Sequence, residues 1–87
     1  MKTEFRKSFV DDLEDARDRG LRARVNQVIG RIEGARSLRE VGGVKKLHRP
    51  GHYRIRIGSY RLGFVLSGDT VIFVRFLHRR DIHRYFP

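Results

Sequence analysis

A stretch of alternating apolar and polar side chains over residues 53–64 constrains the fold more than any other part of the chain. In its first half, apolar residues at every second position alternate with Arg54 and Arg56, which predicts a strand. The pair Gly58-Ser59 follows, with glycine first as a two-residue type II′ turn prefers, and a second alternating segment comes after it. The sequence therefore predicts a β-hairpin with one apolar face and one basic face.

A turn at Gly58-Ser59 also fixes the register of this hairpin. It places Arg56 directly opposite Arg61, because the two residues have matching offsets from the turn. Directly opposed like charges destabilise a sheet. We infer that a chain that keeps two guanidinium groups in this position has an anion to bind there.

The basic residues are concentrated in the part of the chain that contains the hairpin. Residues 1–33 hold eight Lys and Arg against seven Asp and Glu, whereas residues 34–87 hold twelve against three. The formal net charge of +10 at pH 7 is therefore carried almost entirely by the second part. Such a surface favours a nucleic-acid backbone or an acidic protein as its partner.

Length and composition set the broad class of protein. A chain of 87 residues is expected to form one domain, spanning residues 1–87. It has no cysteine, which excludes disulfides and thiolate metal sites. We find no apolar run of membrane-spanning length and no signal peptide, so we expect a cytoplasmic protein with no membrane partner.

The first part of the chain predicts one short strand and two helices. The strand is expected over residues 1–6. A capping box at Ser8 is expected to start the first helix, and Gly20 to break or end it. A stronger apolar stripe predicts the second helix over residues 21–33, with Gly34 as its C-cap. Both helices are expected to face a core.

The second part of the chain predicts strands and a polar tail. Residues 44–48 are expected to form a short strand or edge segment, and residues 70–77 a central strand that is apolar on both faces. Arg75 is the one charge inside that strand, and we expect it to pair with an acid such as Asp81. On one face we place Ile72, Val74 and Phe76, and on the other Val71, Phe73 and Leu77. The tail is expected to pack through Ile82 and Phe86.

Together these elements predict an α+β domain. Two N-terminal helices pack on one face of a small antiparallel sheet in the order β-α-α-β-β-β, followed by a short C-terminal helix or tail. The other face of the sheet exposes the arginines of the hairpin.

Three features resemble the RelE/ParE toxin superfamily of bacterial and archaeal toxin–antitoxin modules, over nearly the whole chain. They are the Lys46-Leu47 pair before a glycine-containing turn, the Tyr53-Arg54-Ile55-Arg56-Ile57-Gly58-Ser59-Tyr60-Arg61 hairpin and the His78-Arg79-Arg80-Asp81-Ile82 run. The resemblance implies a RelE-like fold and a toxin in a hetero-oligomer with a cognate antitoxin, bound through an acidic or amphipathic segment. RelE-type toxins cut messenger RNA, usually in the ribosomal A site, whereas ParE-type toxins inhibit DNA gyrase.

The resemblance also implies an active site on the concave face of the sheet. By position, the basic catalytic residues of RelE-type toxins match Arg54, Arg56, Arg61 and Arg79. His83 matches the terminal position where many relatives hold tyrosine, so the chain departs from the family there. The residue types fit metal-independent attack of the RNA 2′-OH on the adjacent phosphate, because guanidinium forks bind phosphate and imidazole can move protons near pH 7.

Further residues are candidates for RNA contact, and each has a structural alternative. Lys45, Lys46, His78, Arg80 and Tyr85 are predicted to bind RNA, and the alternative for each is a solvated or packed side chain. For His78 a helix cap or a packing role is favoured. Arg61 is the strongest single candidate, because neighbouring Gly63 is expected to leave room for a ligand. The three scattered acids Glu40, Asp69 and Asp81 do not predict a divalent-metal site, and we expect no cofactor.

Three hypotheses for the function remain open on the sequence. The first is a ribosome-dependent messenger-RNA endonuclease toxin. The second is a ParE-like toxin that inhibits DNA gyrase and needs no proton-transfer group. The third is an inactive cationic module that binds an acidic partner.

Overall fold

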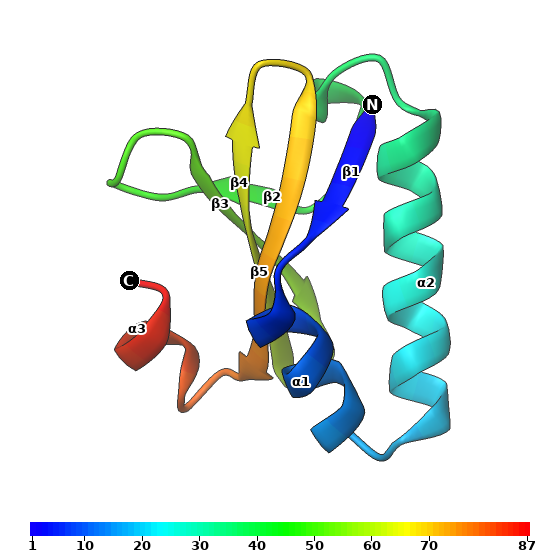
Figure 1. Cartoon of the computed structure of the whole chain (residues 1–87), viewed down its shortest axis with the longest axis vertical. Helices are drawn as coiled ribbons and strands as arrows, with labels where there is room; N and C mark the ends of the chain where they lie inside the picture. Colours follow the sequence, from blue (N-terminus) through cyan, green and yellow to red (C-terminus); the bar gives the residue numbers. More distant parts are fainter.

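The computed structural model describes residues 1–87 and shows a twisted sheet with two helices on one face and a short helix on the other (Figure 1). The predicted α+β fold is confirmed. The strands lie in the order β1-β5-β4-β3-β2. Their bounds are β1 (Lys2–Phe5), β2 (Val44–Lys46), β3 (His52–Ile57), β4 (Tyr60–Ser67) and β5 (Thr70–His78).

The sheet is mixed rather than antiparallel throughout. β2, β3, β4 and β5 are antiparallel neighbours, whereas β1 pairs with β5 in parallel. The antiparallel expectation was correct for the strands that follow one another along the chain. It was wrong for β1, because this strand reaches β5 only after both helices and three other strands, and no turn fixes its direction.

The central hairpin forms with the predicted register. Arg56 lies opposite Arg61, and Ile57 lies opposite Tyr60. Gly58 has φ of +58° while Ser59 has no positive φ, as a type II′ turn requires. Turn chemistry and a two-residue period therefore sufficed to place these strands.

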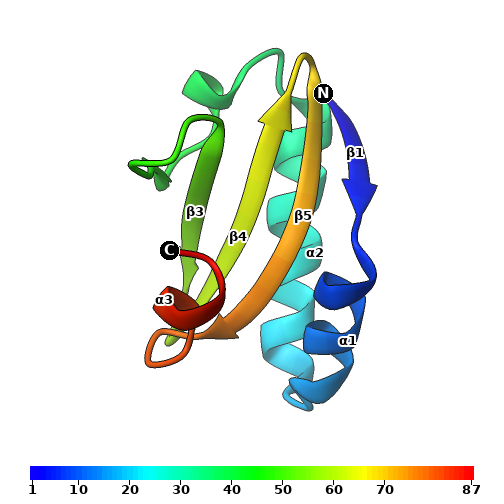
Figure 2. The same ribbon diagram turned by 60° about the vertical axis from the view of Figure 1, so that its left-hand side comes forward.

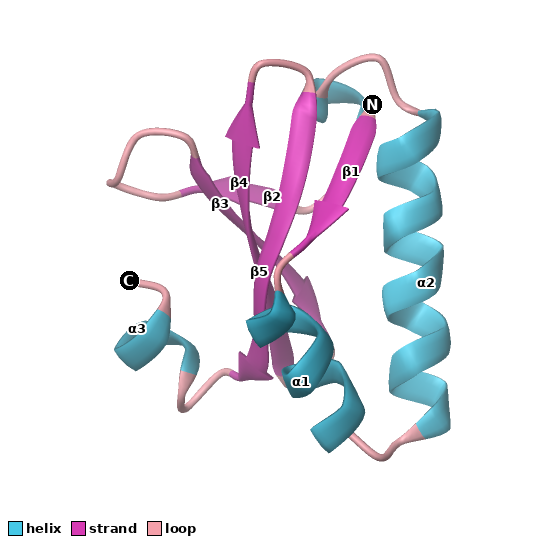
Figure 3. Ribbon diagram, in the orientation of Figure 1, coloured by secondary structure: helices cyan, strands magenta, loops and turns pink.

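The helices begin and end differently from the prediction. They are α1 (Lys7–Asp15), α2 (Arg19–Gly34) and α3 (Ile82–Tyr85), with a 3₁₀ turn at Leu38–Glu40 (Figure 3). No capping box forms at Ser8, which lies inside α1. Asp18 caps α2 by accepting backbone N–H bonds of 2.9 and 3.2 Å, so Gly20 lies in the first turn of α2 rather than ending α1.

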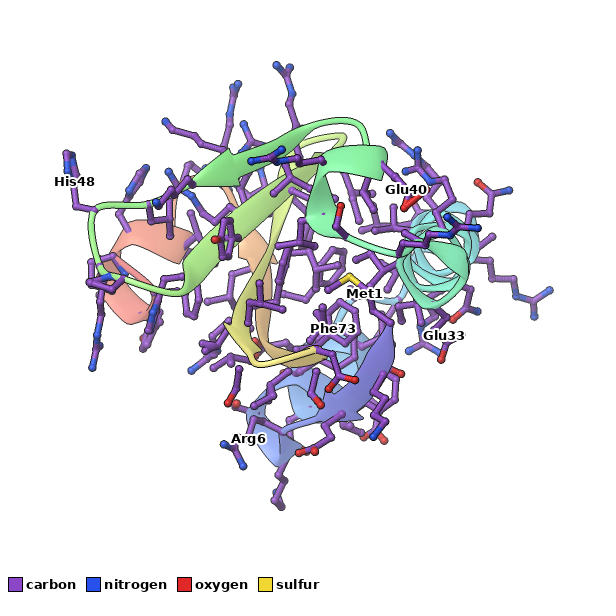
Figure 4. The ribbon with its side chains drawn as sticks, turned by 90° about the horizontal axis from the view of Figure 1, so that it is seen from above. Met1, Arg6, Glu33, Glu40, His48 and Phe73 are labelled. Carbon is purple, nitrogen blue, oxygen red and sulfur yellow. The ribbon has the colours of Figure 1, made fainter.

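The core lies between the sheet and the two long helices. Phe73 is in this interior when the molecule is seen from above, whereas Arg6 and His48 lie at the periphery (Figure 4). Val25 and Ile32 of α2 have no exposed surface. Burying a side chain of this size contributes about 1.5–3 kcal/mol, so α2 is held mainly by its apolar face. None of the helices has the length and apolar character needed to cross a membrane.

A β-bulge in β5 changes which side chains face the core. Gly63 pairs with Arg75 but the next residue, Phe64, pairs with Phe73, so Val74 is an extra residue on β5. Phe73 and Phe76 consequently both lie in the core, although strict alternation would put them on opposite faces. The face assignment based on an unbroken period of two was therefore wrong beyond position 73.

α1 closes the edge of β5 where β1 ends. The backbone N–H of Arg6 donates to the carbonyl oxygen of Phe73 at 2.9 Å, and Ser8 Oγ donates to that of Val74 at 2.6 Å. Asp12 Oδ2 accepts the backbone N–H of Phe76 at 2.9 Å. The N-cap backbone of α1 and two of its side chains therefore satisfy an edge that would otherwise need another strand.

Arg75 pairs with Asp12 and not with Asp81 as expected. Its Nε and Nη2 atoms donate to the two carboxylate oxygens of Asp12 at 2.7 and 3.0 Å. Asp12 is 9% exposed and is the one buried charged residue of the core region. The expected partner was close in sequence, whereas the actual one is brought near by the packing of α1 on β5.

Candidate active site

Two rows of side chains cross the sheet on the face opposite α1 and α2. In the first row, Lys45, Arg54 and Gly63 are paired across β2, β3 and β4. In the second, Arg56 pairs with Arg61 across β3 and β4. Because side chains alternate between the faces of a strand, residues two apart point to the same side. The strand pattern itself therefore gathers four cations on one surface.

These rows line an open hollow of about 540 Å³. Neither of the two ion pairs in the molecule involves a residue of this hollow, and it contains no carboxylate. All five predicted catalytic side chains are brought together there. The lining residues are Gly43, Lys45, Arg54, Arg56, Arg61, Arg79 and His83.

The guanidinium group of Arg61 is held by the backbone and repelled by its arginine neighbours. Its Nη1 donates to the carbonyl oxygens of Gly58 at 3.1 Å and Tyr60 at 2.9 Å, which fixes one side of the guanidinium group. Desolvation, followed by repulsion from Arg56, Arg54 and Arg79, lowers the pKa of Arg61. The group stays charged near neutral pH, so a bound anion would relieve this repulsion.

Two elements beyond the hairpin complete the hollow. The backbone N–H of Arg79 donates to the carbonyl oxygen of Ser59 at 2.8 Å, which ties the residue after β5 to the hairpin turn. Nη1 of Arg54 lies 3.3 Å from Nδ1 of His83. A guanidinium group can only donate, so Nδ1 accepts, and the tautomer that fits carries its proton on Nε2.

His83 reaches the hollow because the chain after β5 folds back onto the basic face. Figure 2 shows α3 lying in front of β3 and β4, on the side opposite α2. Ile82 and Phe86 are buried there, as predicted for the tail. The expectation that Gly63 leaves room for a ligand was wrong, because the ring of Phe86 fills that space: a Cβ at position 63 would lie 2.6 Å from Cδ2 of Phe86.

The structure separates the five residues predicted to contact RNA. Lys45 lines the hollow, and Lys46 lines a neighbouring hollow of about 410 Å³. His78, Arg80 and Tyr85 line neither. The His78 ring packs edge-on against the ring of Tyr60, and its Nδ1 accepts the backbone N–H of Arg80 at 3.1 Å, which matches the packing alternative. The ring of Tyr85 packs over the guanidinium group of Arg75.

Sequence reasoning missed some of the residues around these hollows. Gly43 lies two positions before Lys45, so the period of two could have placed it on the same face. His48 and Pro87 line the second hollow, which forms where the loop after β2 meets the chain end. No local pattern brings those two segments together. No three His, Cys, Asp or Glu side chains in the molecule are placed to hold a metal ion.

Comparison with known proteins gives both a family and close relatives. A family model described as the ParE toxin of the type II toxin–antitoxin system matches residues 3–83. A curated protein from Methanocaldococcus jannaschii, Toxin RelE3, is 40% identical over 91 residues, and the match covers the whole of both chains.

Solved structures match the fold as well. The RelB–RelE antitoxin–toxin complex from Methanococcus jannaschii contains a chain that is 39% identical, with a TM-score of 0.82 over 97% of this chain and 99% of that one. The YoeB dimer from Staphylococcus aureus matches with a TM-score of 0.72 over 91% of this chain and 97% of that one, at 18% identity. The second match supports the fold alone.

Proposed function

The chain belongs to the ParE toxin family of type II toxin–antitoxin systems, and from this premise we propose that it is a ribosome-dependent endonuclease that cuts messenger RNA. The observation that carries the proposal is the convergence of four arginines and His83 on one hollow without a carboxylate. A site of this kind is matched to a phosphate of the RNA backbone. The ribosome enters through the resemblance to RelE-type toxins, which usually act in the A site.

The arginines would bind and activate the scissile phosphate. Guanidinium forks donate bidentately to phosphate oxygens and stay charged at the reaction pH. The guanidinium group of Arg61 is already held by two carbonyl oxygens, so this donor is oriented before substrate binds, and the backbone of Arg79 is tied to the hairpin turn. Preorganised donors of this kind stabilise the charge that develops on the phosphorane.

The reaction we propose uses the substrate's own nucleophile. The 2′-oxygen forms a bond to phosphorus while the bond from phosphorus to the 5′-oxygen breaks, which leaves a 2′,3′-cyclic phosphate and a 5′-hydroxyl group. One proton leaves the 2′-OH and one joins the 5′-oxygen. His83 is the proton-transfer group, since it is the one imidazole that lines this hollow.

The contact between Arg54 and His83 links binding to proton transfer. In the free protein, Nδ1 of His83 accepts from Nη1 of Arg54 at 3.3 Å. When Arg54 turns to a phosphate oxygen, that nitrogen is released as an acceptor beside the substrate. His83 is then ready to take the proton of the 2′-OH only when a phosphate is present.

An antitoxin is the partner that we propose for the resting state. The matched chain of the RelB–RelE antitoxin–toxin complex is 39% identical to this chain, which supports an antitoxin as its partner. An acidic or amphipathic segment of an antitoxin would neutralise the free cations of the basic face. The resulting hetero-oligomer would hold the toxin inactive.

Inhibition of DNA gyrase is the second candidate, and the match to a ParE model favours it. Gyrase inhibition requires a binding surface and no proton-transfer group. The gyrase hypothesis therefore predicts that toxicity survives the removal of the His83 side chain, whereas the nuclease hypothesis predicts that toxicity is lost.

The test is induction of the chain in a host without the antitoxin, with mapping of RNA 5′ ends and of DNA-damage signalling. We expect new 5′ ends inside translated messages, and no such ends from the Arg61→Ala variant. Arg31→Ala is the matched control, because Arg31 is an exposed arginine of α2 far from the hollow. DNA damage with intact transcripts would select the gyrase inhibitor, and the absence of toxicity would select the inactive module.

A further inference from the structure

We propose that Phe86 and Tyr85 are positioning residues that clamp the tail, residues 79–87, onto the sheet and so hold His83 at the hollow. The proposal rests on the proton-transfer role given to His83 under the proposed function. It adds a mechanical role to residues that touch neither substrate nor phosphate in the scheme above.

The first anchor is the ring of Phe86. The ring is 4% exposed and lies against the backbone of Gly63. Any residue with a Cβ at position 63 would clash with the ring. The ring also stacks on His52, with centroids 5.2 Å apart. The backbone N–H of Phe86 donates to the carbonyl oxygen of Ile82 at 2.8 Å, which closes the last turn of the tail.

The second anchor is the ring of Tyr85, which packs on a guanidinium group that cannot turn away. Arg75 is held by both carboxylate oxygens of Asp12, so the plane of its guanidinium group is fixed. Its central carbon lies 4.7 Å from the centroid of the Tyr85 ring. The buried pair between α1 and β5 therefore offers the tail a rigid cationic surface.

The two anchors explain how an exposed histidine on a short helix keeps its place. α3 has only four residues and no side-chain cap, and such a helix is marginal on its own. Buried Ile82 precedes His83, and the two anchors follow it within three positions. The backbone of His83 is thereby held on both sides along the chain, with Nδ1 of its ring 3.3 Å from Nη1 of Arg54.

If these residues position His83, their loss should change the kinetics in a way that a purely stabilising role would not. Loss of an anchor should leave phosphate binding intact, because three of the arginines come from β3 and β4 and Arg79 is tied to Ser59 by its own backbone hydrogen bond. It should slow the chemical step, because misplacing a reacting group by about 1 Å costs on the order of 100-fold. We therefore expect kcat to fall by about 10- to 100-fold for Phe86→Ala while KM changes less than about twofold.

The experiment combines kinetics with a readout that needs no activity. Tyr85→Ala removes an exposed ring and leaves the Asp12–Arg75 pair in place, so it should fold even if Phe86→Ala does not. Tyr85→Phe and Phe86→Leu are the conservative partners expected to restore kcat. Amide hydrogen exchange at Arg84 and Phe86, followed by NMR, reports the clamp directly, and we expect it to speed up at least about tenfold in both alanine variants.

The outcomes distinguish this proposal from the proposed function. Faster exchange in the alanine variants of a protein that never cuts RNA would uphold the clamp and overturn the nuclease. Unchanged exchange and unchanged kcat in both alanine variants would overturn the clamp while leaving the nuclease intact. Weaker binding of a 2′-O-methyl RNA to Tyr85→Ala at unchanged exchange would also overturn it, since Tyr85 would then be stacking on a base.

Discussion

The two faces of the sheet differ in how completely their interactions are satisfied. On the helix face, the buried side chains other than Asp12 are apolar, and the edge of β5 is closed by hydrogen bonds from α1 and its N-cap. On the basic face, four arginines line one hollow without a carboxylate partner. The first face stabilises the fold, and the second carries repulsion that a bound anion or an acidic partner would relieve. The main core and the proposed site thus lie on opposite sides of one five-stranded sheet.

The largest effect is expected where the two faces meet, at Asp12. Asp12→Ala leaves Arg75 without its partner and Phe76 without an acceptor for its N–H. Removal of one member of a fully buried pair costs about 3–5 kcal/mol, and because the side chain of Arg75 is 23% exposed we expect the free energy of unfolding to fall by about 3 kcal/mol, the lower end of that range. Urea denaturation measures it.

The neighbouring acid is the matched control for this change. Asp11 pairs with Lys7 at 2.8 Å on the surface, where both side chains are largely exposed. Asp11→Ala should change the free energy of unfolding very little. Equal losses in the two variants would contradict the distinction between a buried pair and a surface pair.

Arg61→Ala tests the basic face with an effect of similar size on activity instead of stability. Loss of one preorganised donor should reduce the rate of messenger-RNA cleavage by about 10²- to 10³-fold, or about 2.7–4 kcal/mol. The melting temperature should not fall, because the pKa of Arg61 is lowered by desolvation and by its arginine neighbours. The cleavage rate and the melting temperature are measured on the same sample. A destabilised variant with a normal rate per folded molecule would mean that the two faces are not separate.

A bound anion should also reduce the repulsion among the arginines of the hollow, with a smaller effect on the free energy of unfolding. A ligand that binds only the folded state stabilises it, by about 1.4 kcal/mol at a concentration ten times its Kd. We expect pyrophosphate to raise the melting temperature of the wild type and to do so less for Arg61→Ala. Equal shifts in both proteins would place the anion outside the hollow.

The smallest effect expected is a gain of stability in Arg56→Gln. The change removes one of two directly opposed charges, and such pairs are worth roughly 0.2–1 kcal/mol. Because the pKa of Arg61 is lowered in the folded state, the folded protein is destabilised at every pH below that pKa. The destabilisation disappears only as the pH rises through it, so the gain should be fully present at pH 7. Differential scanning calorimetry of both proteins at pH 7 measures it, and a lower melting temperature would contradict it.

The basic hollow could largely be predicted from the sequence because it depends on local rules. The period of two put Arg54 and Arg56 on one face, and the turn at Gly58 set Arg61 opposite Arg56. Resemblance to known toxins added Arg79 and His83, and both line the hollow. The hairpin needs no information from distant parts of the chain.

The sequence-based predictions that were wrong concern contacts between distant segments of the chain or an interruption of a regular pattern. Asp12 meets Arg75 only because α1 packs beside β5, and 63 positions separate them in the chain. Phe86 fills the space over Gly63 only because the tail folds back. The parallel direction of β1 has no local signal either. Each of these is set by tertiary packing, which periodicity cannot encode.

The bulge at Val74 makes the count of residues in β5 matter as much as their identity. One extra residue shifts the phase of everything that follows, so that Arg75 joins the row of Gly63 on the basic face while Phe76 turns inward. A deletion of Val74 would restore the regular alternation and exchange the two sides from there onward. The sheet could keep its hydrogen-bond ladder. The segment that carries Arg79 and His83, however, would leave β5 shifted by one residue and would be directed toward the opposite face of the sheet. We therefore expect a single-codon loss in this strand to disrupt the proposed site without altering any of its residues.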